Sequence, residues 1–150
     1  MTKELSVSAI RNGTVIDHIS SAATFKVVEI LQVAAESSIV LIGCNLPSKR
    51  IGKKGILKIE NRRLSPMEVN RIAIIAPEAT VNIIKEFHVV EKFRVQIPDD
   101  IEGFVRCYNP HCVTNTESVT SRFEVINRSP LQIRCVYCER VMEGAEIVIR

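Results

Sequence analysis

Runs of hydrophobic residues along the first two-thirds of the chain predict a strand-rich fold. The apolar runs 5–10 and 14–19 flank Arg11-Asn12-Gly13, and an Asn-Gly pair between two such runs is a strong signal for a β-hairpin. Further strands are predicted at 38–46, 56–61, 80–84 and 87–97. The first two of these flank a loop, 47–55, that is rich in lysine and glycine.

Two segments between these strands have the spacing of amphipathic helices. In the first, which Ser20 or Ser21 can cap, apolar residues recur three or four positions apart: Val27, Ile30, Leu31 and Ala34. The second begins at Ser65 with Glu68 three positions later, which is a capping box, and it ends before Pro77. The order β-β-α-β-β-α-β-β predicts an α+β domain, an antiparallel sheet with two helices, close to the ferredoxin-like arrangement.

Residues 99–150 are predicted to form a separate, small, all-β domain resembling a zinc ribbon. The boundary lies at Ile97-Pro98-Asp99-Asp100, where the charge balance changes sign: residues 1–98 carry a net charge of +5 and residues 99–150 carry −2. The apolar runs after it are short and show no helical periodicity. A domain of about 50 residues is too small to be stable without a cross-link or a metal.

Four cysteines in this small domain have the spacing of a metal site. Cys107 and Cys112 enclose four residues, Cys135 and Cys138 enclose two, and 22 residues separate the pairs. Two such knuckles present four thiolates to a tetrahedral zinc ion and leave no position open for water. We therefore expect one structural zinc per chain. Chance packing, an iron–sulfur centre, or His111 in place of one thiolate are the weaker alternatives.

The sequence offers no set of residues with catalytic geometry. Asp17 and His18 are adjacent, but neighbours on a strand point to opposite faces, which argues against a dyad. Glycine-rich phosphate loops and nucleophile motifs are absent from the sequence. We expect a binding and regulatory module rather than an enzyme. A cytoplasmic location is expected, since no signal peptide or membrane span is apparent and five cysteines, an odd number, fit reduced thiols and a metal.

Positive charge is concentrated in residues 49–63. Seven basic residues face one acidic residue, Glu60, in this stretch: Lys49, Arg50, Lys53, Lys54, Lys58, Arg62 and Arg63. Such a run is often only a solvated surface, but it can also form an anion site, for which Lys58 on a strand is well placed and Lys92 could meet it. The stretch lacks the aromatic residues that stack on single-stranded nucleic acid. A zinc-ribbon nucleic-acid-binding protein and an amino-acid sensor on the same scaffold are the competing interpretations.

Five segments together resemble the family of aspartate carbamoyltransferase regulatory subunits. They are GTVIDHI at 13–19, IGCNLPS at 42–48, LKIEN at 57–61, APEATVN at 76–82, and the four-cysteine pattern with YCE at 137–139. The resemblance spans almost the whole chain. It implies an allosteric nucleotide-binding domain at 1–98 and a zinc domain at 99–150 that docks on the catalytic subunit.

The resemblance also implies a mode of action and partners. A purine triphosphate activates, and a pyrimidine triphosphate inhibits, the committed step of pyrimidine biosynthesis, which the catalytic subunit carries out. The expected effectors are ATP and CTP, with UTP as a further candidate. The chain itself would perform no chemistry, would pair as a regulatory homodimer, and would bind neither nucleic acid nor membrane.

Ten residues fall at the nucleotide site that the resemblance implies. Base recognition falls on Val7, Ala9, Ile10, Asp17 and Ile84. Ribose and phosphate contacts fall on Val15, Asp17, Lys58, Val89 and Lys92, and His18 lies beside the phosphates. Three positions, Glu4, Ser8 and Phe87, differ from residues that are common in the family.

Overall fold

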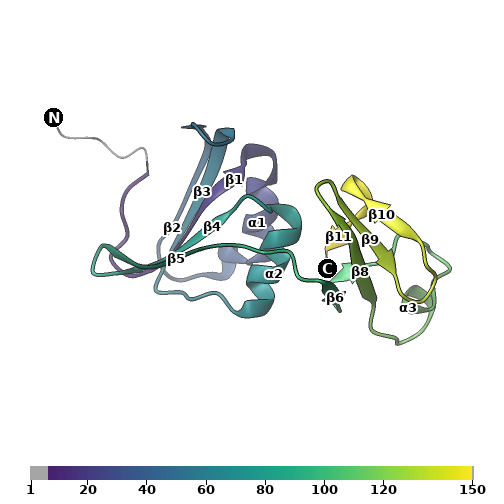
Figure 1. Ribbon diagram of the computed structural model, residues 1–150. Helices are drawn as coiled ribbons and strands as arrows, with labels where there is room; N and C mark the ends of the chain where they lie inside the picture. The colour runs from purple at the N-terminus through teal and green to yellow at the C-terminus, as the bar shows by residue number, and fades with distance from the viewer. Residues whose placement is uncertain (1–6, 150) are drawn as a thin grey trace. The chain divides into compact units, whose positions relative to one another are not determined.

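Five antiparallel strands form the sheet of the N-terminal half of the chain (Figure 1). In the computed structural model, which describes residues 7–149, they lie in the order β2-β3-β1-β4-β5. Their bounds are Gly13–Ser20 (β1), Val40–Ser48 (β2), Gly52–Glu60 (β3), Thr80–Lys85 (β4) and His88–Arg94 (β5). The order β4-β1-β3-β2 is that of a ferredoxin-like sheet, and β5 extends it beside β4. The predicted α+β class is confirmed.

Two α-helices lie on one side of this sheet (Figure 1). Helix α2, Pro66–Ile75, begins with the predicted capping box, in which the side chains and backbone N–H groups of Ser65 and Glu68 bond reciprocally. Helix α1, Thr24–Ile30, is shorter than predicted and is flanked by the 3₁₀ turns η1, Ser21–Ala23, and η2, Val33–Ala35. The left-handed backbone of Gln32, at φ 52°, ends the α-helical pattern and turns Val33 rather than Ala34 inward. Ser20, expected to cap this helix, makes no capping hydrogen bond.

The core of this half lies between the helices and one face of the sheet. Alternate residues of the three central strands point into it, and residues spaced three to four apart on the helices meet them. The fully buried side chains include Ile16, Ile19, Val27, Leu57, Ile59, Ile72, Ala73 and Val81. This alternation leaves the other members of each central strand on the opposite face of the sheet.

The N-terminal hairpin expected around Asn12-Gly13 is not formed. Residues 8–10 are irregular, and β1 has its two neighbours in β3 and β4, so no edge of β1 is open to residues 5–10. Asn12 instead accepts the N–H of Asn61 on its carbonyl and the N–H of Glu86 on its side chain. Residues 5 and 6 of the expected strand, like Glu4, lie outside the described residues.

The lysine-rich segment 47–55 is not the loop that its composition indicates. Strands β2 and β3 continue through it as a hairpin, pairing Ser48 with Gly52 and Leu46 with Lys54 around a short turn at 49–51. Gly52 has a φ of +82°, a conformation that glycine adopts without strain. The alternation along β3 therefore decides which face of the sheet each of its lysines, Lys53, Lys54 and Lys58, lies on.

The second unit, Ile97–Arg150, contains a four-stranded sheet in the order β10-β9-β8-β6 and a separate pair, β11-β7. The strands are Asp100–Glu102 (β6), Val105–Arg106 (β7), Arg122–Arg128 (β8), Leu131–Cys135 (β9), Val141–Glu143 (β10) and Val148–Ile149 (β11). One helical turn, α3 at Val113–Thr116, and a 3₁₀ turn, η3 at Gly144–Glu146, complete the unit. The predicted all-β character is confirmed apart from these turns. None of the helices within residues 7–149 combines the length and the apolar character that a membrane span requires.

Arg62 joins the end of β3 to both helical segments. Its guanidinium donates to the carbonyl of Leu31 at 2.7 Å, to Glu36 at 2.8 Å and to Glu68. Its own carbonyl accepts the hydroxyl of Thr14 at 2.6 Å. Burial alone would raise the pKa of Glu68, but the hydrogen bonds from Ser65 and Arg62 and the charge of Arg62 lower it below its ordinary value of 4.5. Arg62 is thus a structural member of the basic run.

Replacing Arg62 should destabilise the N-terminal unit in a pH-dependent way. Arg62→Met leaves Glu36 and Glu68 without their cation, and we expect a loss of about 2 kcal/mol in the free energy of unfolding. Because the folded pKa of Glu68 is lowered, its contribution is present above 4.5 and disappears as the pH falls through the folded value. Urea unfolding, followed by NMR signals of α2 at pH 7 and pH 4, measures this. Arg63→Met, at the exposed neighbouring position, should change stability by less than about 0.5 kcal/mol. Equal losses for both variants would contradict the role given to Arg62.

Candidate functional site

The four cysteines of the second unit converge on one point. Their sulfur atoms all lie within 4.8 Å of one another, with 3.6 Å between those of Cys107 and Cys138 and 3.7 Å between those of Cys112 and Cys135. Sulfurs bound at about 2.3 Å to a tetrahedral metal lie about 3.8 Å apart. The geometry therefore fits a tetrahedral metal ion with four thiolate ligands.

Side chains around the cysteines fix the first knuckle. Asn115, on α3, donates from its amide to the carbonyls of Cys107 and Asn109, at 2.8 Å each. The hydroxyl of Thr114 donates to the sulfur of Cys112 at 3.2 Å. Hydrogen bonds of this kind orient ligands and stabilise the charge on a metal-bound thiolate.

Burial makes the site unfavourable for free thiolates. It raises the pKa of Cys107 to about 12 and also raises the pKa of Cys135. For Cys138 burial acts in the same direction, but hydrogen bonds, first that from the N–H of Arg140, outweigh it and lower the pKa to about 7. A bound cation would supply the positive charge that buried thiolates need.

His111 takes no part in this cluster. It is exposed on the first knuckle, and its backbone N–H donates to the side chain of Asn109 at 3.0 Å. The metal-ligating group of the described residues consists of the four cysteines alone.

A second candidate site lies on the face of the N-terminal sheet away from the helices. One row of directly paired residues crosses four strands there: Lys58 on β3, Val15 on β1, Asn82 on β4 and Lys92 on β5. Residues paired in this way have their side chains on the same face. A lysine therefore lies on each side of Val15 and Asn82 on this face.

One end of this face is apolar and is covered by the segment 7–10. Ile10 packs with Val15 and Ile84, and all three are buried. Val7 lies over Gly43 of β2, so the segment crosses the strands rather than pairing with one of them. Val89, paired with Ile84, is exposed beside this group, whereas Ala9 is exposed on the segment itself.

Lys58 holds this segment in place. The residue is only 8% exposed, and its ammonium group donates to the carbonyls of Val7 and Ser8 at 3.0 and 2.9 Å. Burial lowers its pKa; the charge of Asp17 acts against this and that of Lys54 adds to it. An ammonium group has three donors, so one remains for a ligand.

Asp17 and His18 both reach the opposite end of the face, contrary to the alternation assumed from sequence. The register of β1 with β3 shifts between Ile16 and Ile19, and His18 has a left-handed φ of 57°. Asp17 pairs with Thr80, and the ring Nδ1 of His18 lies 3.2 Å from the hydroxyl of that same threonine. The bulge thus brings two adjacent side chains together, which a regular strand forbids.

Charged neighbours surround this pair. Lys54 Nζ lies 2.8 and 3.1 Å from the two carboxylate oxygens of Asp17. Burial alone would raise the pKa of Asp17, but the hydrogen bonds of Lys54 and of the His18 N–H outweigh it and lower the pKa. Burial lowers the pKa of His18; Asp17 opposes this, and the charges of Lys54, Arg50 and Lys92 reinforce it. An anion bound beside His18 would act against this lowering of its pKa.

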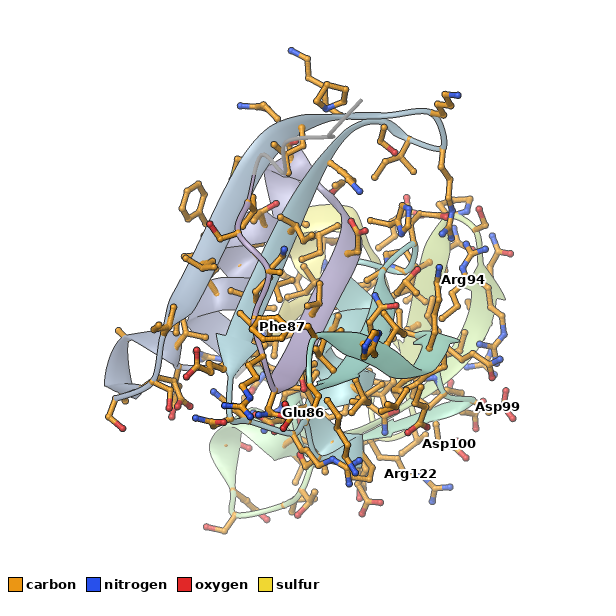
Figure 2. All side chains as sticks on the ribbon, turned by 90° about the vertical axis from the view of Figure 1, so that its left-hand side faces the viewer. Glu86, Phe87, Arg94, Asp99, Asp100 and Arg122 are labelled. Atoms are coloured by element: carbon orange, nitrogen blue, oxygen red, sulfur yellow. The ribbon has the colours of Figure 1, made fainter. Side chains whose placement is uncertain are left out.

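An ion-pair cluster at this end was not anticipated from the sequence. Glu78 accepts hydrogen bonds from Arg94 at 2.6 Å and from Arg50 at 3.4 Å, and Arg50 also reaches Thr80 at 3.4 Å. Arg94 pairs with Thr80 across β4 and β5 (Figure 2 labels it on this edge of the sheet). Arg50 was visible only as part of a basic run, and no spacing in the sequence connects it to β4.

The face brings together most of the residues expected at a nucleotide site. Val15, Asp17, Ile84 and Lys92 lie on it by strand pairing, and His18 joins them through the bulge. Sequence reasoning missed Asn82 and Thr80, although both lie in the segment APEATVN, whose alternation with the buried Val81 could have indicated them. Phe87, with Glu86, lies at the β4–β5 turn and is exposed (Figure 2).

Comparison with known proteins gives the same family for both halves of the chain. Residues 5–96 match the model of the aspartate carbamoyltransferase regulatory chain, allosteric domain, and residues 99–148 match that of the same chain's metal binding domain. Proteins named aspartate carbamoyltransferase regulatory chain from Pyrococcus abyssi and Pyrococcus horikoshii are 56% and 54% identical over 147 residues, which is 97% of each chain. The one from Methanothermobacter thermautotrophicus is 48% identical over 96% of this chain and 93% of its own.

The cysteine cluster predicts a metal-dependent fold for the second unit. Cys138→Ser removes one thiolate from a closed set of four, and we expect loss of the metal and unfolding of residues 97–150, while the first unit stays folded. Metal analysis and amide NMR spectra of the full chain measure both effects. Cys44→Ser, in the fifth cysteine on β2, is the matched control and should keep one metal per chain. A Cys138→Ser chain with a full complement of metal and an unchanged spectrum would contradict this.

Proposed function

The chain belongs to the family of aspartate carbamoyltransferase regulatory chains, and from this premise we propose that it senses nucleoside triphosphates and transmits their binding to a catalytic subunit. Its relatives are named as regulatory chains, and the matching domains are an allosteric and a metal-binding domain rather than a catalytic one. The controlled reaction would be the carbamoylation of aspartate in pyrimidine biosynthesis. ATP, CTP and UTP are the candidate effectors.

The observation that carries this proposal is that the sheet face away from the helices, here called the open face, is apolar at one end and charged at the other. Its apolar end, where Val89 and Ala9 are exposed beside the buried Ile10, Val15 and Ile84, offers apolar contacts for a base, and the backbone of residues 7–10 offers carbonyl and N–H groups beside them. Lys58 and Lys92, midway along the face, and Lys54 and His18 at its other end offer partners for phosphates. A ligand with a planar apolar part and a polyanionic tail fits this gradient, whereas an amino acid is too short to use both ends.

The disposition of the basic run favours this ligand over nucleic acid. Four of its seven cations are held within the N-terminal unit: Arg50 by Glu78, Lys54 by Asp17, Lys58 by the carbonyls of residues 7 and 8, and Arg62 by two glutamates. They are not spread as a continuous exposed stripe, which binding to a nucleic-acid backbone requires. The family assignment points in the same direction.

We propose that the metal is zinc and that the domain it folds docks on the catalytic subunit. Four thiolates in a tetrahedral set are the ligands zinc prefers in structural sites. The residues next to two of the ligands, Tyr108 and Tyr137, are exposed aromatic side chains at the two knuckles. Aromatic residues are enriched in protein interfaces, so loss of the metal would also displace these contacts.

We also propose that two chains pair through their N-terminal units. β2 lies at one edge of the sheet, opposite in the strand order to β5. Ile39 and Ile42, just before and within this strand, are 56% and 43% exposed. An edge strand with exposed apolar residues is suited to pairing with a second copy.

Removing Lys92 or Lys58 should weaken nucleotide binding. We expect Lys92→Ala to cost about 1 to 2 kcal/mol and Lys58→Ala about 1.5 to 3, because the buried lysine also fixes residues 7 and 8. Calorimetric titration of the full chain with ATP and CTP measures both. Lys85→Ala removes the same charge from the far end of β4 and should bind like the parent. If all three variants bind alike, the phosphate site lies elsewhere.

Stripping the metal should separate assembly from nucleotide binding. A mercurial that removes zinc should abolish co-elution with the catalytic subunit in size-exclusion chromatography, because the docking domain unfolds. The same sample should still bind ATP or CTP through the N-terminal unit. Co-elution of the metal-free chain would place the docking surface on the first unit instead.

A further inference from the structure

The cluster around Glu78 is not explained by the sites described so far. Glu78 lies just before β4 and receives two guanidinium groups on one carboxylate oxygen. Arg94, on the neighbouring β5, makes the shorter contact, 2.6 Å. Arg50 makes the longer one, 3.4 Å, and is the more weakly held of the two.

Arg50 comes from a hairpin that is not adjacent to β4 in the sheet. It lies in the turn between β2 and β3, and the strand order β2-β3-β1-β4 puts β1 between that hairpin and Thr80. Its guanidinium nonetheless lies 3.4 Å from the hydroxyl of Thr80, to which the ring of His18 is also bonded. The side chain therefore passes over the end of β1, beside His18, and closes that end of the open face.

The charges at this end do not cancel. Four cations, Arg50, Lys54, Lys92 and Arg94, accompany two carboxylates, Asp17 and Glu78, which leaves a net charge of +2. Arg50, Lys54 and Lys92 all act electrostatically on His18. An anion of more than one charge is the ligand that such a group of side chains favours.

The distance along the face fits a terminal phosphate. From the apolar row at Ile84 to the charged row at Thr80 is four residues, or about 13 Å along a strand. A nucleoside triphosphate with its base at the apolar end would pass its first phosphates by Lys58 and Lys92 and bring its last one to Thr80 and Arg50. A monophosphate would end short of this row.

We propose that Arg50 recognises the terminal phosphate of a nucleoside triphosphate, leaving Glu78 to bind it, and thereby makes the chain prefer triphosphates to diphosphates and monophosphates. The proposal rests on the nucleotide site proposed above. Arg50 suits this role because its planar group can bind two phosphate oxygens at once and its present contacts are long. Glu78 acts as the competing anion that occupies Arg50 when the third phosphate is missing.

Titration of the full chain with ATP, ADP and AMP tests this. In Arg50→Gln, we expect ATP to bind about five- to tenfold more weakly and ADP and AMP to change less than about twofold. Lys49→Gln, which removes the same charge from the same turn, should leave the ratio of ATP to ADP affinity unchanged. Equal weakening of ATP and ADP, or no change for ATP, would overturn the proposal. If the parent chain binds none of the three nucleotides, the nucleotide site itself is refuted.

A second variant distinguishes recognition from a merely structural clamp. Glu78→Gln removes the competing carboxylate, so it should tighten ATP binding by about two- to fivefold, opposite in sign to Arg50→Gln. If the Arg50–Glu78 contact only holds the hairpin in place, both variants should weaken all nucleotides alike. Arg50→Lys keeps the charge but loses the planar guanidinium, which can bind two phosphate oxygens at once. Its affinity for ATP should lie between that of the parent chain and that of Arg50→Gln.

Discussion

The central position of β1 is the constraint on which the N-terminal unit depends. Both of its edges are occupied, by β3 and β4, so the chain before it finds no strand to pair with and crosses the sheet instead. Because the helices fill one face, this crossing takes place on the other, where Ile10 covers Val15 and Ile84. The apolar end of the open face is therefore a consequence of where β1 lies.

The irregularity in the same strand sets the polar end. A regular β1 would send Asp17 and His18 to opposite faces, and His18 would then point toward the helices and the apolar core. The bulge and the left-handed His18 keep both side chains at Thr80, where they meet Lys54 and Arg50. One strand thus provides an apolar residue, Val15, and two or three residues further on the charged pair Asp17 and His18.

The two units gain their stability from different sources. The first buries a continuous core between two helices and a five-stranded sheet and adds hydrogen-bonded ion pairs at Arg62. The second is about half as long and has a smaller core, with Ile101, Phe123, Ile133 and Met142 fully buried. Its four cysteines converge beside this core, where a metal ion would add the stability that so small a core lacks. Metal loss and ligand binding can therefore act on separate parts of the chain, and regulation of a partner requires a coupling free energy between them.

The sequence alone determined the features that depend on local spacing. The knuckles of Cys107 to Cys138, the capping box at Ser65, the alternation of β3 and the α+β class could all be predicted, because each follows from residues close together in the chain or from a short repeat. The five segments from GTVIDHI to YCE were also enough for the resemblance to the family that the comparisons show. Tertiary structure decided the features that depend on strand pairing. Asn12-Gly13 does not form a hairpin turn because both edges of β1 are already paired, whereas segment 47–55 is part of a hairpin because β2 and β3 continue through it. It also decided which members of the basic run are held by partners. Arg50 and Lys54 find theirs between 28 and 37 residues away, and Arg62 reaches Glu36, 26 residues away, besides the nearby Glu68. Contacts of that kind depend on strand order and on one bulge, and the local pattern of apolar and polar residues predicts neither of them.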